Sequence, residues 1–446
     1  MTPRVSVVIP SHRRRAPLVR TLRALATQTL PPAEYEVIVV LDGAQDDSAA
    51  EVARLELPFA LRVETQPPLG AAAARNRGAA AARAPLLLFL DDDMEAAPQL
   101  LAAHLHAQST RPGVVLGYFD TPPEEDEGLL ALDARLWWAG ELAERARPAH
   151  RFTFRDLWTG NVSIPCEHFE GAGGFDEQFG QGTAGEDWEL GVRLHARHVP
   201  FSFARAAASV HHDRPTLARS RGRLFASGRG HALMVRANPA LFRAFSFSSP
   251  PRRAIYQPVW HLIWWRPALA MRLARPLWSL LRPLEALKLR SAWRRLHWLL
   301  LDGAYWCGVS TELGDVDVWH ELASTVPVGP PASREAEIDV AVELDAGLAR
   351  LDARLAREPA DAARVRYGST PIGRIAPLAG AERLRAVHVR EALLGPLQAR
   401  LLAAMAWDEA FPHAESAALI AAVLGRGEDE AMPPRPVASP EIEAGV

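Results

Sequence analysis

The first 120 residues alternate between short apolar runs and stretches with helical spacing, and this alternation restricts the fold more than any other feature of the sequence. Residues 5–9 are apolar throughout and end at Pro10, as expected of a strand buried on both faces of a sheet. Strands that alternate with helices indicate right-handed crossover units and a parallel sheet. The expected strands are residues 5–9, 37–41, 61–63 and 86–90, and the expected helices are residues 17–28, 48–55 and 70–83.

Polar residues follow three of these strands where each strand ends. Ligands of such sheets bind beyond the carboxyl ends of the strands, which here selects residues 10–15, 42–47 and 91–93. The last of these is a run of three aspartates, whose mutual repulsion is costly unless a cation or hydrogen-bond donors neutralise it. Hard divalent cations prefer such oxygen ligands and often keep phosphate as a partner. The residues leave two interpretations open: a metal–diphosphate site, or a solvated acidic turn that caps the next helix.

Two further sets of acids suit binding or catalysis and also have plain structural explanations. Asp42 follows a buried strand and can accept hydrogen bonds from a nucleotide base or ribose, or it can stabilise a turn. Glu186 and Asp187 begin a helix that we expect at residues 186–197. There they either complement the helix dipole or include a general base for an incoming hydroxyl.

Two adjacent histidines follow these acids in the sequence. His211 and His212 come at the end of a strand pair expected near residues 201–211. Because side chains alternate along a strand, at most one of the two is expected to share a site with the aspartates.

Composition and charge exclude several classes of protein. The formal net charge is −3, so there is no overall basic field for nucleic acid. The two cysteines, Cys166 and Cys307, exclude a disulfide scaffold and a cysteine-rich zinc site. The N-terminus has no apolar stretch of signal-peptide length, and no apolar run reaches the roughly 18 residues of a transmembrane helix. We therefore expect a cytoplasmic protein.

Residues 251–300 differ in character from the rest of the chain. They hold ten Arg or Lys residues against one acid, Glu285, with six tryptophans interleaved. Prolines at positions 258, 267, 276 and 283 cut the segment into short helices. Two interpretations remain open: contact with the surface of an anionic membrane, or a helical subdomain with tryptophan inside and arginine outside. Nucleic acid is not an expected partner.

The C-terminal part reads as a small α+β module. After a linker at residues 324–334, we expect a helix at 338–357, a hairpin at 364–375 and a helix at 380–405. The Pro- and Glu-rich tail from residue 426 is expected to be disordered.

Taken together and in order, several segments resemble the inverting family 2 glycosyltransferases with the GT-A fold. The matching segments are VSVVIPSHRR, VIVVLDGAQDDS, GAAAARNRGAAAARAPLLLFLDDDM, GNVSI, GGFDE and GEDWELGVRL, followed by VHH. They span about residues 4–215. The resemblance implies an α/β GT-A nucleotide-diphospho-sugar transferase domain at residues 1–245, with a mostly parallel sheet and flanking helices. The basic, Trp-rich helical segment at 246–323, the module at 335–425 and the tail at 426–446 would follow it.

The resemblance also implies roles for individual residues. Asp187 would be the catalytic base, and Glu186 would contact the acceptor or the donor sugar. Asp93 would bind Mg²⁺ or Mn²⁺, and His211 would complete the metal site, with His212 as the competing assignment. The implied nucleotide-sugar-binding residues are Pro10, Ser11, Asp42, Gly70, Arg75, Asn76, Asp91 and Asp92.

Several tryptophans lie near the implied site. Trp188, beside the implied base, would either stack on a sugar or belong to the core. The region that shapes the acceptor pocket in such enzymes would contain Trp137, Trp138 and Trp158.

The function implied by the resemblance is transfer of a sugar, with inversion, from a nucleotide-diphosphate donor to an acceptor hydroxyl. Family habit favours a UDP-sugar as donor. The acceptor would be a glycan, a lipid-linked molecule or a small molecule. Cell-envelope polysaccharide biosynthesis is the expected setting, in the cytoplasm or on the inner face of the membrane. The Q-x-x-R-W motif of processive synthases is absent from the sequence, which favours the addition of one or a few sugars.

Two alternatives to this enzyme remain. One is a non-catalytic GT-A-like scaffold that binds a glycan or a partner, although such relatives tend to lose metal ligands. The other is a sugar-phosphate nucleotidyltransferase, which is less favoured because the N-terminal loop SHRRR lacks the glycines of that class.

Overall fold

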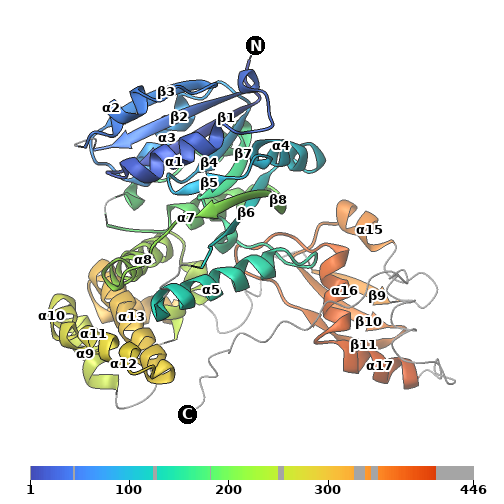
Figure 1. The fold of residues 1–446 in the computed structure, drawn as a ribbon. Coiled ribbons are helices and arrows are strands. Elements are labelled where there is room, and N and C mark those ends of the chain that lie inside the picture. The colour runs from blue at the N-terminus through green and yellow to red at the C-terminus, as the bar shows by residue number, and fades with distance from the viewer. Residues whose placement is uncertain are drawn as a thin grey trace. The chain divides into compact units, whose positions relative to one another are not determined.

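The structure is a computed structural model that describes residues 2–43, 46–123, 128–180, 182–249, 256–325, 337–342 and 350–407. The chain divides into two compact units (Figure 1). Unit 1 comprises residues 1–142 and 152–327, and unit 2 comprises residues 143–151 and 328–446. The expected tail at 426–446 and the last part of the expected module lie outside the described residues.

Among the described residues, unit 1 is built on a sheet of eight strands in the order β3-β2-β1-β4-β7-β6-β8-β5. The neighbours β3, β2, β1 and β4 run parallel to one another, as do β6 and β8. The strands β7 and β5 run antiparallel to their neighbours. The predicted α/β class with a mostly parallel sheet is confirmed. The strands are β1 (Val5–Ser11), β2 (Tyr35–Asp42), β3 (Ala60–Gln66), β4 (Leu86–Leu90), β5 (Met94–Ala96), β6 (Val114–Asp120), β7 (Asn161–Pro165) and β8 (Phe201–His211).

Helices cover both faces of this sheet, and alternation along β1 shows how. Val7 and Ile9 belong to the cluster that contains the buried leucines of α1, whereas Val8 belongs to the cluster on the opposite face, with Ala72 of α3. All strands and helices expected in the first 120 residues are present. The helices up to the end of β8 and just after it are α1 (Arg15–Leu25), α2 (Ser48–Ala53), α3 (Ala71–Ala80), α4 (Leu100–Thr110), α5 (Leu129–Arg145), α6 (Cys166–Gly171), α7 (Glu186–Ala196) and α8 (Leu217–Ala237).

The prediction of a strand pair near residues 201–211 is wrong. This stretch forms one strand, β8, both halves of which pair with β6. The register jumps between Gly117, which faces Ala204, and Tyr118, which faces Ala208, so that the intervening residues of β8 bulge out. No glycine, proline, asparagine or aspartate interrupts residues 201–211, so the sequence holds no signal for the turn that a hairpin requires.

The segment after α8 folds into helices, as expected. Pro258, Pro267 and Pro276 lie in the first turns of α9, α10 and α11, where proline is tolerated because those N–H groups have no partner within the helix. The long helix α13 packs along α8. No helix among the described residues combines the length and the apolar character needed to cross a bilayer. The helices are α9 (Gln257–Trp265), α10 (Pro267–Leu273), α11 (Arg275–Ser279), α12 (Leu281–Ala286), α13 (Arg290–Leu313) and α14 (Val316–Thr325).

Unit 2 has the expected α+β character, with two local corrections. The expected hairpin is present as β10 (Ala362–Tyr367) and β11 (Thr370–Ile375). The helix expected at 338–357 is wrong in its first part, where β9 (Glu337–Val342) pairs in parallel with β10. Its last part is confirmed as α15 (Leu351–Arg357), and residues 343–349 lie outside the described part of the chain. Alternating buried residues, Ile338, Val340 and Val342, explain the strand. The helix expected at 380–405 is two helices, α16 (Ala386–Leu394) and α17 (Gln398–Trp407), separated at Gly395 and Pro396.

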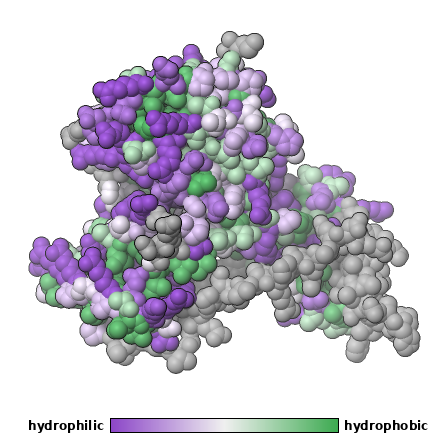
Figure 2. All heavy atoms as spheres, viewed as in Figure 1, coloured by the Kyte–Doolittle hydropathy of each residue, from purple (hydrophilic) through white to green (hydrophobic). Residues whose placement is uncertain are grey.

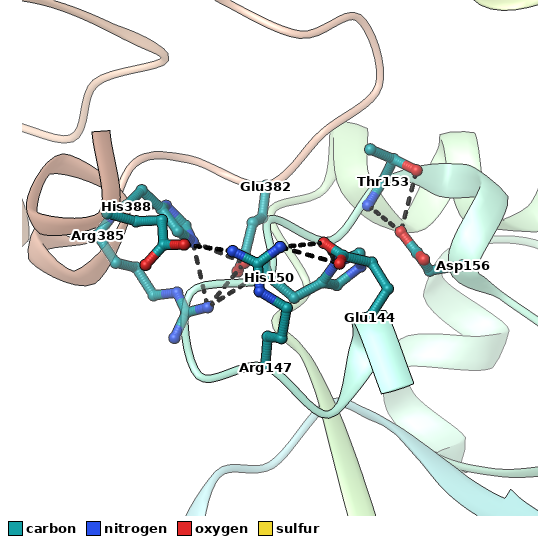
Figure 3. Close-up of polar contacts among 9 residues, drawn as sticks. Glu144, Arg147, His150, Thr153, Asp156, Glu382, Arg385 and His388 are labelled. Carbon is teal, nitrogen blue, oxygen red and sulfur yellow. Dashed lines mark hydrogen bonds and ion pairs between the residues drawn. The ribbon is translucent and has the colours of Figure 1, made fainter. Parts of the chain in front are cut away.

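Unit 2 also includes residues 143–151, which lie far from its other residues in the sequence. Arg151 donates hydrogen bonds to the backbone carbonyls of Glu382, Ala376 and Asp361 at 3.0, 3.3 and 2.9 Å. Arg385 bonds the carbonyl of His150 at 3.2 Å (Figure 3). The segment is therefore held by charge-assisted hydrogen bonds within the unit.

Candidate functional site

The three aspartates after β4 each find different partners. Asp91 pairs with Arg75 of α3 at 2.9 Å. Asp92 accepts a hydrogen bond from Ser11, at the end of β1, at 2.7 Å. Arg14 lies between the other two carboxylates, 3.0 Å from Asp92 and 2.6 Å from Asp93. The acidic run is therefore neutralised mainly by arginines from the crossovers that precede it, and it is not a freely solvated turn.

Arg75 joins the aspartates to the start of α7. Its side chain is only 6% exposed, and it contacts Glu186 at 2.9 Å as well as Asp91. Glu186 also accepts a hydrogen bond from the backbone N–H of Gly185, at 3.2 Å. Arg75 therefore brings together the predicted residues Asp91 and Glu186, which are far apart in the sequence.

Asp187 lies in the first turn of α7, directly after Glu186. Gly185 precedes the helix with a φ of 114°, in the left-handed region that favours glycine. Burial raises the pKa of Asp187, and the negative charge of Glu186 raises it further. The hydrogen bond from the Trp188 N–H at 2.8 Å and the charge of Arg75 lower it in part. A carboxylate with a raised pKa binds protons more strongly than an ordinary aspartate, as a general base requires.

His211 is the histidine that faces the aspartates. Its Nε2 lies 3.6 Å from Oδ1 of Asp93, whereas His212 turns to Glu95 at 2.7 Å. Burial alone would raise the pKa of Asp93, but His211 and Arg14 lower it well below its usual range, so that this carboxyl is ionised. Burial raises the pKa of Asp92 to about 7, with Arg14 and Ser11 opposing the rise.

Asp93 and His211 fit a divalent cation. Oδ1 of Asp93 is buried and has no hydrogen-bond partner, and the ring nitrogen that faces it is Nε2 of His211. The described residues contain no group of three His, Cys, Asp or Glu side chains that could hold a metal ion. A cation here would thus have two protein ligands and would take further oxygens from phosphate, which is the usual manner of Mg²⁺.

Asp42, at the end of β2, is held by backbone donors. Its carboxylate accepts hydrogen bonds from the N–H groups of Leu69 and Gly70 at 2.7 and 3.0 Å, and from Gln66 at 2.9 Å. Gly70 has a φ of +100°, and a Cβ there would lie 2.6 Å from the carbonyl oxygen of Gly180. This close approach requires glycine and fixes the entrance of α3 beside Asp42.

The remaining predicted residues lie at the same edge but differ in what they are free to do. Pro10 and Ser11 form the end of β1. Asn76 is engaged elsewhere: its amide exchanges two hydrogen bonds with the backbone of Phe175, at 2.9 and 2.8 Å, and donates to Glu177. Both ends of this side chain therefore hold the loop before α7.

Aromatic rings border the site on two sides. Trp138 of α5 packs against Trp158 and Phe119, and the ring centroids of these three residues lie 5.0 to 6.4 Å apart. The centroids of Phe119 and Trp138 also lie 5.4 and 6.4 Å from that of His211. Trp188 instead stacks on His231 of α8, with ring centroids 4.8 Å apart, and lies near Phe245. Trp188 thus packs α7 against the helices that follow, whereas Trp138 lies beside His211 and Trp158 packs on Trp138.

Sequence reasoning missed Arg14 and Gln66. Arg14 occurs in the expected strand-end segment 10–15, and the run of three aspartates nearby was a signal that a cation is needed there. Gln66 ends β3, and only the parallel pairing of β3 with β2 places it opposite Asp42.

A cavity of about 1010 Å³ lies apart from these residues. It runs along α1 and is lined by Arg15, Arg20 and Arg23, and by residues around β5 and the ends of β6 and β8. None of the predicted site residues lines it.

Comparisons with known proteins find similar sequences and structures. Residues 6–170 match the sequence profile described as Glycosyl transferase family 2. A validoxylamine A glucosyltransferase from Streptomyces hygroscopicus subsp. limoneus is 37% identical over 236 residues, covering 47% of this chain and 51% of that protein. Its counterpart from Streptomyces hygroscopicus subsp. jinggangensis (strain 5008) is 36% identical, covering 47% of this chain and 55% of that protein. The chain spans about half the length of these relatives.

Among solved structures, the mannosyltransferase PcManGT from Pyrobaculum calidifontis in complex with GDP-Man and Mn²⁺ is similar with a TM-score of 0.44 and 18% sequence identity. The match covers 68% of this chain and 86% of that one.

Replacing Arg75 by methionine removes the cation that Asp91 and Glu186 share. We expect the free energy of unfolding to fall by about 3 kcal/mol, because two partly buried carboxylates lose their partner. Arg77→Met is the matched control, since Arg77 lies on the same helix but pairs with Glu64 at the surface, where the expected loss is below about 1 kcal/mol. Urea unfolding followed by tryptophan fluorescence measures both variants, and equal losses would contradict the role assigned to Arg75.

Proposed function

We propose that this chain, whose residues 6–170 match the profile described as Glycosyl transferase family 2, transfers a sugar, with inversion, from a nucleoside-diphosphate donor to the hydroxyl of an acceptor. The observation that carries the proposal is the chain of contacts from Glu186, beside the raised-pKa carboxyl of Asp187, through Arg75 to Asp91. It ties a candidate base to the carboxyl ends of the parallel strands, where ligands of such sheets bind.

The donor is proposed to lie across the ends of β1, β2 and β4. Asp42 and Ser11 would border the base and ribose, and Asp91 would face the ribose. Asp42 is buried and its carboxylate already accepts three hydrogen bonds. These bonds hold the side chain in place, which supports a role as a rigid part of the wall of the donor site. A UDP-sugar is the donor class that the resemblance favours, and the two glucosyltransferases named above place glucose first among sugars to test.

Asp187 is proposed to remove the proton from the acceptor hydroxyl as that oxygen attacks the anomeric carbon from the face opposite the leaving diphosphate. A single displacement of this kind inverts the configuration. The reaction requires the ionised carboxylate, and the raised pKa strengthens its pull on the hydroxyl proton. The stack of Trp188 on His231 supports a fixed position for this part of α7.

Asp93 and His211 are the residues proposed to hold a divalent cation, Mg²⁺ or Mn²⁺. When bound, the ion would neutralise negative charge that develops on the leaving diphosphate. Arg14, which bridges Asp92 and Asp93, holds the ionised Asp93 carboxylate in place.

The acceptor is proposed to pack against Trp138 and Trp158, since sugar rings present C–H faces that suit aromatic rings. A glycan, a lipid-linked molecule and a small polyhydroxy molecule all fit this chemistry. The proposed setting is cell-envelope polysaccharide biosynthesis on the cytoplasmic side of a membrane, which rests on the resemblance alone.

A panel of nucleotide sugars, headed by UDP-glucose and read by release of nucleoside diphosphate, tests the activity. We expect Asp187→Asn to lower the turnover of the preferred donor by about 10²–10⁴-fold while leaving donor affinity in isothermal titration nearly unchanged. Glu189→Gln, on the same helix, is the control and should keep near wild-type turnover. Donor binding without turnover by the wild-type chain, across donors and acceptors, would favour the scaffold alternative and contradict the enzyme.

The pH dependence of kcat/KM tests the role of the acid pair. Rate requires ionised Asp187, so activity is lost as pH falls through its raised pKa. Glu186→Gln removes the neighbouring negative charge, which lowers the pKa of Asp187 and shifts the acidic limb to lower pH. The profile is measured at saturating Mn²⁺ with Glu189→Gln as control. An acidic limb that stays in place or moves upward would refute the assignment.

The two adjacent histidines allow a matched test of the metal site. We expect His211→Ala to raise the Mn²⁺ concentration for half-maximal activity by about tenfold or more, because it removes a ligand. His212→Ala should change it little, since that ring pairs with Glu95. Mn²⁺ binding in the presence of UDP, followed by electron paramagnetic resonance, gives an independent readout. A larger effect of His212→Ala, or full activity after chelation, would contradict the metal site proposed at Asp93 and His211. Arg14 would then be the main source of positive charge beside Asp92 and Asp93.

A further inference from the structure

The helices α10, α11 and α12 expose a stripe of leucines. Leu269, Leu273, Leu277, Leu280 and Leu287 follow one another at spacings of four, four, three and seven residues, which places them on one face of a helix. The linking residues Ala274 and Leu280 keep right-handed helical backbone angles, so this spacing runs through the breaks between the helices. Leu273 is 59% exposed and Leu287 is 68% exposed.

The leucines of this stripe are not among the buried residues of the hydrophobic core. Trp278 and Leu281 are the buried side chains of α11 and α12, and they pack with Trp293, Leu300 and Leu301 of α13. The exposed leucines therefore form a second apolar face, in addition to the one that holds the helices to the rest of unit 1. In Figure 2, hydrophobic and hydrophilic side chains lie next to each other over these helices, at the lower left.

Positive charge surrounds the stripe. Residues 256–300 contain eight Arg or Lys residues and one acid, Glu285. Glu285 accepts a hydrogen bond from the N–H of Leu129, and Arg294 pairs with Asp133. Within the part of the chain that the structure describes, the other cations pair with no carboxylate: Arg266, Arg272, Arg275, Arg282, Lys288, Arg290 and Arg295.

Tryptophans complete the surface. Trp265, at the end of α9, is 71% exposed, and the guanidinium of Arg266 lies 5.4 Å from the centre of its ring. Trp298 on α13 is also exposed. Tryptophan favours the boundary between lipid headgroups and acyl chains, where its ring is buried and its N–H meets water.

We propose that the exposed side of α9–α13 binds the surface of a bilayer that contains anionic phospholipid. The leucines and Trp265 would enter the acyl boundary, and the unpaired cations would contact lipid phosphates. Charge complementarity selects this occupant: a lipid surface presents many phosphates at once to cations spread over several helices. Because no described helix can cross a bilayer, the helices would lie in the plane of the interface. The proposal is independent of the proposed transferase activity.

Co-sedimentation of the full chain with vesicles tests the proposal. We expect binding to vesicles of phosphatidylcholine with three parts in ten of phosphatidylglycerol, weaker binding at high salt, and little binding to phosphatidylcholine alone. The combined variant Trp265→Ser, Leu273→Ser and Leu287→Ser should weaken binding by about tenfold or more. The combined variant Arg272→Glu, Arg275→Glu and Arg290→Glu should have a similar or larger effect.

Matched controls separate this surface from the rest of the molecule. Leu378→Ser changes an exposed leucine in unit 2, and the pair Arg20→Glu and Arg23→Glu changes exposed cations of α1. Both should bind vesicles like the wild type. Unchanged circular dichroism and thermal midpoints show that the variants remain folded, as surface substitutions should.

Several outcomes would overturn the proposal. They are absence of binding to anionic vesicles, equal binding to neutral ones, or normal binding by both combined variants. A chain that is dimeric by mass photometry, becomes monomeric in the apolar variant and ignores vesicles would assign the surface to self-association. Asp187→Asn should still bind vesicles, and the apolar variant should still turn over a water-soluble acceptor, so failure here is distinguishable from failure of the transferase assignment.

Discussion

The candidate site depends on one buried cation. Arg75 lies between Asp91 and Glu186, and these three residues come from a crossover helix, a strand end and the start of α7. Without positive charge at this point, carboxylates from separate parts of the chain would repel one another as the fold closes. Arg14 performs the same task for Asp92 and Asp93. The two arginines thus hold a dense group of acids in fixed positions beyond the sheet.

Packing from the C-terminal half of unit 1 supports the same site. His231 of α8 stacks on Trp188 and accepts or donates a hydrogen bond at the hydroxyl of Tyr305 on α13, 2.9 Å away. Burial lowers the pKa of His231 to about 3, so this ring stays neutral and belongs to the packing rather than to proton transfer. The helices α8 and α13 therefore form a support for the base as well as a covering layer, and the leucine stripe lies on helices packed against that support.

The sequence predicted the elements whose signals are local. Apolar runs marked β1, β2 and β4, and the polar residues after them marked the edge where Ser11, Asp42 and Asp91 are found. The partners could not be read in this way. Nothing near Arg75 in the sequence indicates that Glu186 will lie beside it, because that contact depends on the path of the chain through β7 and the loops around it.

Local signals also misled where tertiary pairing decided the outcome. A strand pair was predicted at residues 201–211, where the structure has the single strand β8. The bulge in β8 is set by its register with β6, which the sequence does not reveal. The start of the expected helix at 338–357 is a strand because β10 supplies a neighbour. The hydrogen bonds between the amide of Asn76 and the backbone of Phe175 likewise depend on tertiary structure. Whether His211 or His212 faces Asp93 depended on strand pairing, which alternation alone left open.

Unit 2 takes residues 143–151 from the middle of the sequence that builds unit 1, and this has a consequence for synthesis. During translation, residues 143–151 emerge from the ribosome long before β9, β10 and β11. The carbonyl groups that Arg151 binds in the folded protein have not yet been synthesised at that point. These hydrogen bonds can form only after residues 361–382 have been translated. A truncated chain that stops after residue 327 would lack all three of these carbonyls, so residues 143–151 would lose the acceptors that hold them in unit 2.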